Sequence, residues 1–340
     1  MRPRSPVERP STRRKVICVI VFLALLYCYW SYVTYDPHPH SIPLRLSISY
    51  RSRQEIAIPH RIHQTYIDEY IPTAYTSYIQ SWLKHHPSWE YYFWSDKDAK
   101  KMIQDRYPQF VSLYDSYTHK LQRSDVIRYF ILHAFGGVYC DMDMVALKNL
   151  EPFLRYNTSV LVPEPSVQSK LLYSKSVIVT NAILASIPNH PFLDYLINSL
   201  AAQRKVIRNS IDVLMTTGPN MLQRVLDDYN RQTNCLQAYF CRVYVSDPQY
   251  LVPTFDVNGM KAYRSKCKKK KRLTSAQIEA CEELTRTNYA NDVPPTAYSN
   301  HLWLHIGWKQ KYEDRHSISI MHIVPNVRRY LQHQHTLDSR

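Results

Sequence analysis

The stretch SDVIRYFILHAFGGVYCDMD, residues 124–143, predicts a helix that leads into a short strand ending in two carboxylates. Asp125 and Arg128 are three residues apart and share one helix face, whereas apolar residues at helical spacing form a packed stripe on another. Gly136 and Gly137 end the helix and permit backbone angles or close contacts that a side chain would prevent. The chain has only five glycines in 340 residues, so chance poorly explains this pair.

The two carboxylates after the glycine pair are Asp141 and Asp143, which alternate with Met142. A pure strand would point both carboxylates to one face, where two hard oxygen ligands can hold a divalent cation. A bare D-x-D triplet is often only a solvated turn, because carboxylates are common in loops. The glycine pair directly before this strand favours the metal site, and a metal acting on phosphate is the chemistry that the pattern indicates.

The composition indicates a folded protein whose positive charge is confined to two segments. Hydrophobic residues make up 45% of the chain, and the net charge is +15. Residues 1–15 carry six basic and one acidic side chain, and residues 261–272 carry eight basic side chains and no acidic one. The remainder holds 29 basic and 27 acidic residues, so its surface is not the basic one that binds nucleic acid. We therefore expect no nucleic-acid partner.

Residues 16–33 contain no charged side chain, follow a basic run and have aromatic residues clustered at their far end. This is the pattern of a single membrane-spanning helix with an aromatic belt. A cleaved signal peptide is the alternative, but the apolar run is long for one and no small-residue cleavage site follows. The basic residues favour a cytoplasmic tail at 1–15, so everything after the helix is expected in the lumen. The sequence thus predicts a type II protein of the Golgi or ER membrane, with residues 34–55 as an extended stem.

The folded domain is expected at residues 56–340, in an α/β class. Strand-like runs at 56–65 and 89–94 alternate with segments of helical spacing, and Ser95 is expected to cap the second helix. A further β-branched run at 176–181 ends in a polar residue. This alternation indicates a βαβ arrangement, whose ligands bind at the carboxyl ends of the strands.

The segment at about 258–292 holds the second basic run and shows weak periodicity. We expect it to be an inserted, mobile, solvent-facing loop. Contact with an anionic lipid headgroup or with a partner is the functional alternative.

The seven cysteines show no pair with the C-x-x-C spacing typical of zinc or redox sites. If the domain is lumenal, Cys235 with Cys241 and Cys267 with Cys281 are candidate local disulfides. This pairing leaves Cys140 as a buried thiol.

Group transfer in the secretory lumen satisfies these constraints. A cation held by Asp141 and Asp143 would neutralise a diphosphate leaving group, and Arg128 would donate to substrate hydroxyls or phosphate. A nucleotide-sugar transferase is the first hypothesis. The alternatives are a lumenal module that binds glycan or lipid without turnover, and a metal-dependent phosphohydrolase, which normally needs more carboxylates than occur near the motif.

The motif Ser-Asp-x-x-Arg-Tyr at 124–129, followed by Gly-Gly-x-Tyr-x-Asp-x-Asp at 136–143, resembles the sugar-binding region of the D-x-D glycosyltransferases of family 32. Further blocks occur in family order, from Ile-His-Gln-Thr at 62–65 to Thr-Gly-Pro at 217–219, so the resemblance covers about residues 56–230. Within this family the chain looks most like the inositol-phosphoceramide mannosyltransferases, and the initiation-specific α-1,6-mannosyltransferases are further members.

The resemblance implies a GT-A fold, which is a single Rossmann-like nucleotide-sugar domain, with Mn²⁺ or Mg²⁺ as cofactor. It also implies retaining transfer from an α-linked nucleotide sugar, with GDP-mannose as the expected donor and a UDP-hexose as the alternative. The implied acceptor is a glycolipid such as inositol phosphoceramide, or a glycan.

Carried over by position, the resemblance implies roles for three groups of residues. The implied catalytic residues are Asp125, Arg128 and Asn181. The implied donor-binding residues are His63, Gln64, Asp125, Arg128, Asp141 and Gly218. The implied metal ligands are Asp141, Asp143 and His305. Within the donor site, His63 and Gln64 would lie near the nucleotide and Asn181 near the reacting sugar.

Overall fold

The computed structural model describes residues 57–203, 207–208, 210–232, 239–269, 272–304 and 316–332. The expected tail, membrane helix and stem, up to residue 55, lie outside these residues. Among the helices that are described, none is both long enough and apolar enough to cross a membrane.

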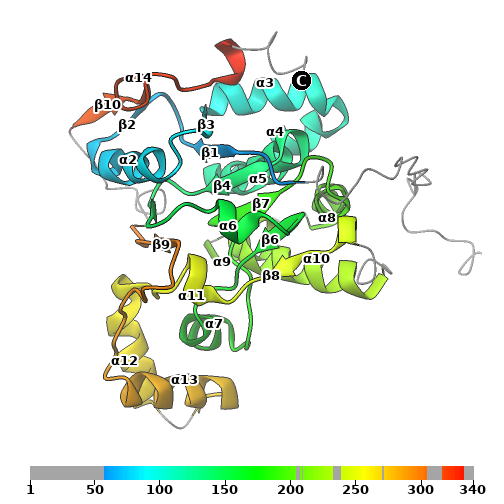
Figure 1. Ribbon diagram of the computed structural model, residues 1–340. Helices are drawn as coiled ribbons and strands as arrows, with labels where there is room; N and C mark the ends of the chain where they lie inside the picture. The colour runs from blue at the N-terminus through cyan, green and yellow to red at the C-terminus, as the bar shows by residue number, and fades with distance from the viewer. Residues whose placement is uncertain are drawn as a thin grey trace, which may run out of the picture. The chain divides into compact units, whose positions relative to one another are not determined.

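A six-stranded mixed sheet forms the centre of the described chain (Figure 1). In spatial order its strands are β3 (Glu90–Trp94), β1 (Arg61–Thr65), β4 (Gly137–Cys140), β7 (Ile183–Ser186), β6 (Ser159–Leu161) and β8 (Tyr244–Val245). β1 runs parallel to β3 and β4, and β6 runs parallel to β8, whereas β7 is antiparallel to both of its neighbours. The expected α/β class is confirmed.

Two hydrophobic cores lie on opposite faces of this sheet, because successive strand residues alternate between them. In β4, Tyr139 belongs to one core, and Val138 and Cys140 belong to the other. The first core includes the helices α3 (Asp96–Arg106), α4 (Val111–Ser116), α5 (Lys120–Phe135), α8 (Pro191–Ser199) and α10 (Pro219–Gln232). The second includes α2 (Thr76–His85), α6 (Glu151–Leu154), α11 (Pro248–Leu251) and α14 (Ile320–Ile323).

The remaining elements surround these layers. Two small antiparallel sheets pair β2 (Tyr70–Pro72) with β10 (Ser317–Ser319) and β5 (Met144–Ala146) with β9 (Ser299–His301). The other α-helices are α7 (Ser166–Tyr173), α9 (Ser210–Thr216), α12 (Met260–Lys268) and α13 (Ser275–Arg286). Short 3-10 helices occur at Thr73–Tyr75, Pro108–Phe110, Leu200–Gln203, Tyr239–Cys241, Val257–Gly259 and Tyr330–Gln332.

Local signals account well for the first half of the domain. Ser95 caps α3, as expected, in a capping box: its hydroxyl accepts from the main-chain N–H of Asp98, whose carboxylate accepts from the N–H of Ser95. The helix expected in residues 124–135 is the last three-quarters of α5.

The glycine pair between α5 and β4 is required by both backbone conformation and space. Gly136 and Gly137 have φ angles of 61° and 101°, a region that side chains strongly disfavour. A Cβ atom on Gly137 would lie 2.7 Å from the carbonyl oxygen of Arg61, and one on Gly136 would lie 2.6 Å from Cδ of Pro188. The pair therefore lets α5 turn directly into β4 while β4 packs against β1.

The expected strand does not continue through the two aspartates. β4 ends at Cys140, and Asp141 to Asp143 form a turn in which the N–H of Met144 donates to the carbonyl oxygen of Asp141 over 3.0 Å. The turn redirects the chain, because β5 leaves the central sheet to pair with β9. A second expected strand, at 176–181, is also wrong: the strand of this region is β7, which begins at Ile183.

The basic segment at 258–292 is a pair of helices, α12 and α13, and not the expected loop. The helices form because buried Tyr263, Ala280 and Leu284 pack with Leu171 of α7 in a third small core. The charged residues of α12 hide this apolar pattern in the sequence.

The disulfide expected between Cys267 and Cys281 is confirmed, and Cys140 is a buried free thiol as expected. Cys241 is disulfide-bonded. Its expected partner, Cys235, lies outside the described residues.

We predict that Gly137→Ala destabilises the protein by about 3 kcal/mol or more, because the methyl group meets main-chain atoms of β1 in a strained backbone region. Gly259→Ala is the matched control, since Gly259 has a φ of −77° and a Cβ there meets only the side chain of Tyr263. Urea unfolding of both variants measures the difference. Equal losses for the two variants would show that backbone geometry at Gly137 is not the cause.

Candidate functional site

A cavity of about 360 Å³ lies beyond the carboxyl ends of β1 and β4, where Thr65 and Asp141 contribute to its wall. The carboxylates in its lining are Asp125, Asp141, Asp143, Glu164 and Asp256. Among the described lining residues, Arg128 is the only lysine or arginine. An acidic cavity of this kind favours a cation and disfavours a bare phosphate.

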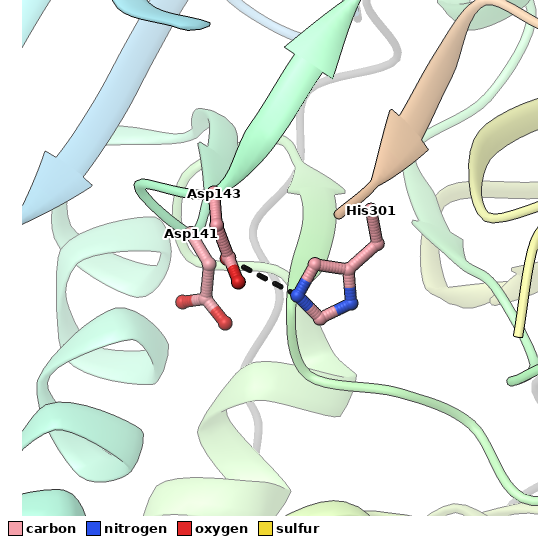
Figure 2. Close-up of side chains that lie close together, drawn as sticks. All are labelled: Asp141, Asp143 and His301. Carbon is pink, nitrogen blue, oxygen red and sulfur yellow. Dashed lines mark hydrogen bonds and ion pairs between the residues drawn. The ribbon is translucent and has the colours of Figure 1, made fainter. Parts of the chain in front are cut away.

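Asp141, Asp143 and His301 form a candidate metal centre in this cavity. Each offers a ligand atom, and these atoms all lie within 4.8 Å of one another. Figure 2 shows the two carboxylates on the turn after β4 and the imidazole at the end of β9, pointing toward one space, with His301 Nε2 3.1 Å from Asp143 Oδ1.

The donor set fits a divalent cation. Carboxylate oxygens suit Mg²⁺ and Mn²⁺, and imidazole is a common ligand of first-row transition metals. Nδ1 of His301 is buried without a hydrogen-bond partner in the described chain. The two aspartates and the histidine are therefore an arrangement that a metal ion would complete.

Pairing of β5 with β9 brings His301 to the aspartates, since Met144 and His301 are partners in that ladder. Asp143 then fixes the chain that follows β9: its carboxylate Oδ2 accepts from the N–H of Leu304 over 2.9 Å, and its carbonyl oxygen accepts from the N–H of Leu302 over 3.0 Å. The third ligand expected from the sequence, His305, lies outside the described residues. His301 lies four residues before His305, an even spacing that in a strand would put both on the same face. Only the long-range pairing of β9 with β5 shows that His301 reaches the aspartates.

The charges of this cluster are set by burial and by its neighbours. Burial alone would raise the pKa of Asp143, but His301 and the N–H of Leu304 outweigh it and hold the pKa at about 2. Burial raises the pKa of Asp141, although Arg128 opposes the rise. The pKa of His301 is raised, because Asp143 more than offsets the effect of burial. Asp143 is therefore ionised throughout the physiological range.

Arg128 is buried next to Asp141 of the candidate metal centre, and its guanidinium is engaged by the protein. Nη1 donates to Asp141 Oδ1 over 2.9 Å and to the carbonyl oxygen of Asn181 over 2.5 Å. Nε donates to the carbonyl oxygen of Ser124, and the group lies 4.6 Å from the centre of the Tyr139 ring. Arg128 thus lines the cavity, yet it orients Asp141 more than it offers donors to a substrate.

Asp125 and Asn181 form a second polar group of the cavity. Nδ2 of Asn181 donates to Asp125 Oδ1 over 2.8 Å, and the hydroxyl of Thr217 donates to Oδ2 over 2.9 Å. Gly218 lies next to them, because a Cβ on it would be 3.5 Å from Asp125 Oδ2. Burial raises the pKa of Asp125 to about 6, against the lowering effects of Arg128 and the two hydrogen bonds.

His63 and Gln64 are fully buried below the cavity and are absent from its described lining. His63 donates from Nε2 to the carbonyl oxygen of Gly136, and Gln64 donates from Nε2 to the carbonyl oxygen of Asp141. They therefore hold the chain directly before and directly after β4 in place, and the next two residues of the chain, Thr65 and Tyr66, line the cavity instead.

A further part of the cavity lining comes from a segment that the sequence analysis did not select. Glu164 follows β6, and its carboxylate accepts from Gln168 Nε2 over 3.1 Å and from the Tyr173 hydroxyl over 3.4 Å. Gln168, Leu172 and Tyr173 belong to α7 and line the cavity as well. A carboxylate between two prolines was the available sequence signal, but it carries no spacing that indicates a ligand.

We predict that Mn²⁺ raises the unfolding temperature of the protein by several degrees, since a ligand at about 100 times its Kd stabilises the folded state by about 2.7 kcal/mol. Asp143→Asn keeps the hydrogen bond from Leu304 but removes the charge, so the Mn²⁺ affinity should fall at least about tenfold. The affinity should also fall as the pH drops from about 8 to about 6, because protons compete for His301, whose pKa is raised.

The control for this thermal titration is Asp115→Asn, which removes an exposed carboxylate outside the cavity lining. It should leave the Mn²⁺ response unchanged. A wild-type response to Mn²⁺ in the Asp143→Asn variant would contradict the metal centre.

We predict that Asp125→Asn stabilises the metal-free protein at pH 8 by up to about 3 kcal/mol, because it removes a buried charge whose pKa is about 6 in the folded protein. In the wild type, the folded protein binds a proton on the Asp125 carboxylate more tightly than the unfolded chain does, because the pKa is raised. The advantage of the variant should therefore shrink as the pH falls from about 8 to about 4. Urea unfolding across this range measures it, and a pH-independent difference would contradict the elevated pKa.

Residues 72–160 match the family described as "Glycosyltransferase sugar-binding region containing DXD motif". Inositol phosphoceramide mannosyltransferase 2 of Schizosaccharomyces pombe is 31% identical over 192 residues, which are 56% of this chain and 52% of that protein. Mannosyl phosphorylinositol ceramide synthase SUR1 of Saccharomyces cerevisiae is 33% identical, over 51% of this chain and 43% of that protein. The chain thus spans about half the length of these relatives. Among solved structures, the PaToxG glycosyltransferase is 17% identical, covers 72% of this chain and 90% of its own, and superposes with a TM-score of 0.40.

The matched region includes Asp125, Arg128 and both aspartates of the candidate metal centre. The first relative is named as an inositol phosphoceramide mannosyltransferase, and the second as a synthase of mannosyl phosphorylinositol ceramide. On this sequence match, residues 72–160 are a glycosyltransferase sugar-binding region with its DXD motif, and the aspartates of that motif share one cavity with His301.

Proposed function

We propose that this protein transfers a hexosyl group, with mannose from GDP-mannose as the first choice, to the inositol headgroup of a ceramide phospholipid or to a related glycan. The observation that carries the proposal is the convergence of Asp141, Asp143 and His301 in the cavity that also holds Asp125 and Asn181. The names of the relatives support mannose as the transferred sugar and inositol phosphoceramide as the acceptor.

Asp141, Asp143 and His301 would hold Mn²⁺ or Mg²⁺. A cation bound there supplies charge that neutralises the diphosphate of the departing nucleotide. Without a cation, the carboxylates of the cavity lining would repel a diphosphate, because Arg128 is already bonded to Asp141. The acidic lining itself therefore supports a metal-dependent donor site.

Asp125 and Asn181 are suited to hold the sugar of the donor. Both line the cavity, and their mutual hydrogen bond fixes the carboxylate and the amide relative to each other. A carboxylate accepts from sugar hydroxyls, and an amide can both donate and accept. Arg128 acts on this group indirectly, since it keeps Asp141 and the main chain of Asn181 in position.

We further propose a GT-A arrangement, a retaining outcome and a lumenal location in the Golgi or ER behind the N-terminal apolar segment. The parallel β3-β1-β4 strands and a D-x-D turn after β4 support the GT-A type. The Cys267–Cys281 disulfide supports an oxidising compartment.

We predict that the full chain in detergent releases GDP from GDP-mannose only when Mn²⁺ or Mg²⁺ is present, and transfers mannose to an inositol phosphoceramide. Asp143→Asn should reduce turnover at least about a hundredfold, in line with the loss of a group that binds the metal. Release of nucleoside diphosphate and mass spectrometry of the lipid measure the two steps. Asp115→Asn, outside the cavity lining, is the control and should retain wild-type turnover.

The same assay separates the alternatives. Turnover with a UDP-hexose in place of GDP-mannose would assign the other donor class. Binding of glycan or lipid without turnover on any donor would show a non-catalytic module, and metal-dependent phosphate release from simple esters would show a phosphohydrolase. Full activity of Asp143→Asn would contradict the proposed role of the metal centre.

A further inference from the structure

The densest group of exposed positive charges in the described chain lies on α12 and on the described residues directly after it. Lys261, Arg264 and Lys268 are exposed and are spaced by three and four residues, so they share one face of the helix. Lys269 and Arg272, also exposed, extend this charge beyond the helix. We call these five residues the basic face.

The basic face is available for a partner. Within the part of the chain that the structure describes, Lys261, Lys268, Lys269 and Arg272 make no side-chain ion pair or hydrogen bond. Arg264 lies 4.7 Å from the ring centre of Tyr289, which leaves its charge near the surface. A basic run that served only to face solvent would need nothing more than these exposed side chains.

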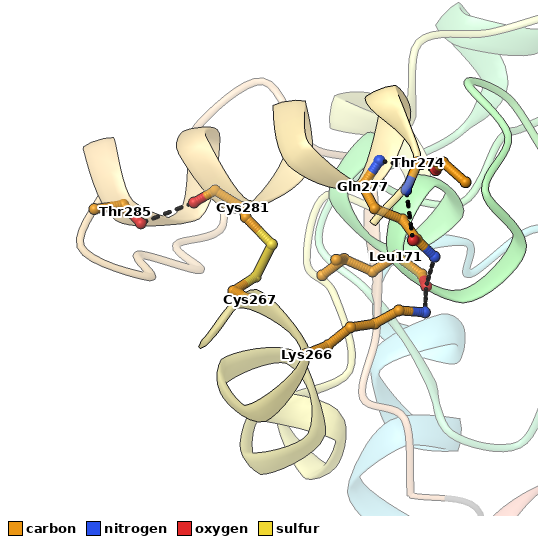
Figure 3. The surroundings of a disulfide bond; sticks show 7 residues. All are labelled: Leu171, Lys266, Cys267, Thr274, Gln277, Cys281 and Thr285. Carbon is orange, nitrogen blue, oxygen red and sulfur yellow. Dashed lines mark hydrogen bonds between the residues drawn. A yellow bond between two sulfur atoms is a disulfide. The ribbon is translucent and has the colours of Figure 1, made fainter. Parts of the chain in front are cut away.

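The protein nevertheless fixes this charge firmly in place. The Cys267–Cys281 disulfide joins α12 to α13, and Figure 3 shows how both helices reach Leu171 at the end of α7. Nζ of Lys266 donates to the carbonyl oxygen of Leu171 over 2.6 Å, and Nε2 of Gln277 donates to the same oxygen over 3.4 Å. The helix pair α12–α13, which we call the hairpin, is therefore fixed against α7 as a rigid platform.

The helix α7 is also a wall of the cavity. Gln168 lines the cavity, and its Oε1 accepts from the main-chain N–H of Asp256 over 2.8 Å and from the Tyr263 hydroxyl of α12 over 3.4 Å. The hydrogen bond from Tyr263 to Gln168 thus links the hairpin directly to a residue of the cavity lining. Docking of the hairpin would fix the α7 wall relative to whatever the basic face binds.

Two exposed apolar side chains lie on the helices that carry this platform. Leu172 of α7, which lines the cavity, is 52% exposed, and Ile278 of α13 is 44% exposed. Basic residues together with exposed aliphatic residues are the combination that binds the interface of an anionic bilayer. A soluble polyanion would not need the apolar pair.

The charges of the cavity and of the basic face are opposite. The cavity wall carries carboxylates that repel the phosphate of a lipid acceptor but accept hydrogen bonds from its hydroxyls. The basic face attracts that phosphate and the anionic lipids around it. The cavity therefore suits the hydroxyls of the acceptor, and the basic face suits the anionic lipid surface that carries the acceptor.

We propose that the α12–α13 hairpin is a docking surface for an anionic lipid bilayer, through which the protein takes its acceptor from the membrane surface. The choice of a lipid acceptor rests on the proposed function. The contact with the bilayer itself rests on the basic face, its disulfide-linked platform and the exposed apolar pair.

Lysine acetylation of the full chain, reconstituted in vesicles and read by mass spectrometry, tests the contact without any need for activity. In vesicles with about 30% phosphatidylinositol, Lys261, Lys268 and Lys269 should be modified at least about threefold more slowly than in pure phosphatidylcholine vesicles. The protection should disappear at about 0.5 M salt, where the screening length becomes short. Lys84 and Lys97, exposed on α2 and α3, are internal controls and should not change.

Equal modification of the three lysines in both kinds of vesicle would overturn the proposal. Protection by heparin in solution, with none by anionic vesicles, would also overturn it, because a soluble polyanion would then be the partner.

A charge-removing variant tests the consequence for turnover. Lys261→Gln, Arg264→Gln, Lys268→Gln and Lys269→Gln combined should lower transfer to a vesicle-borne acceptor about tenfold or more. Metal-dependent hydrolysis of the donor should stay at the wild-type rate, because none of the four side chains lines the described cavity. The matched variant Lys261→Arg, Lys268→Arg and Lys269→Arg combined should keep wild-type transfer, since it retains the charge.

The two proposals fail in different ways. Protection by anionic vesicles with no activity on any donor would contradict the proposed function and leave the docking surface supported. Normal donor hydrolysis and normal vesicle transfer in the Gln variant would overturn the docking surface and leave the proposed function supported.

Discussion

The buried guanidinium of Arg128 is the interaction on which the rest of the site depends, because a buried charge must be compensated by opposite charge and by hydrogen bonds. It donates to Asp141 and to the main chain of Asn181, and it lies over the ring of Tyr139. These partners come from β4, from the turn after it and from the chain before β7. One side chain of α5 therefore holds three segments around the cavity, and its loss would leave carboxylates buried without their counter-charge.

Arg128 offsets only part of the acidity of the cavity, and this imbalance links the structure to chemistry. A site that lacks a cation is electrostatically unsuited to a diphosphate, whereas the same site with a divalent ion in contact with Asp141, Asp143 and His301 is suited to it. Within the described residues, a cluster of exposed positive charge lies elsewhere, on α12 and the residues that follow it. In the proposed function, this separation of the two signs would give the donor and the membrane different places to bind.

Local signals made the α5–β4 unit predictable from sequence. The helix, the glycine pair and the two aspartates lie within residues 124–143, and each follows from short-range rules of capping, backbone freedom and side-chain direction. The Cys267–Cys281 disulfide was also expected, since its two cysteines are close in sequence. The α12–α13 helices were not, because exposed lysines hide the few apolar residues that pack on α7.

The sequence by itself determined the chemistry of the central motif. It placed Arg128 one helical turn from Asp125, and it placed Asp141 and Asp143 shortly after the glycine pair that ends the helix. Only the tertiary structure decided which residues join them. His301 arrives through the pairing of β9 with β5, and the α7 wall arrives with the chain after β6. The contact between Asp143 and His301 joins residues 158 positions apart, and no local pattern encodes a pairing at that distance.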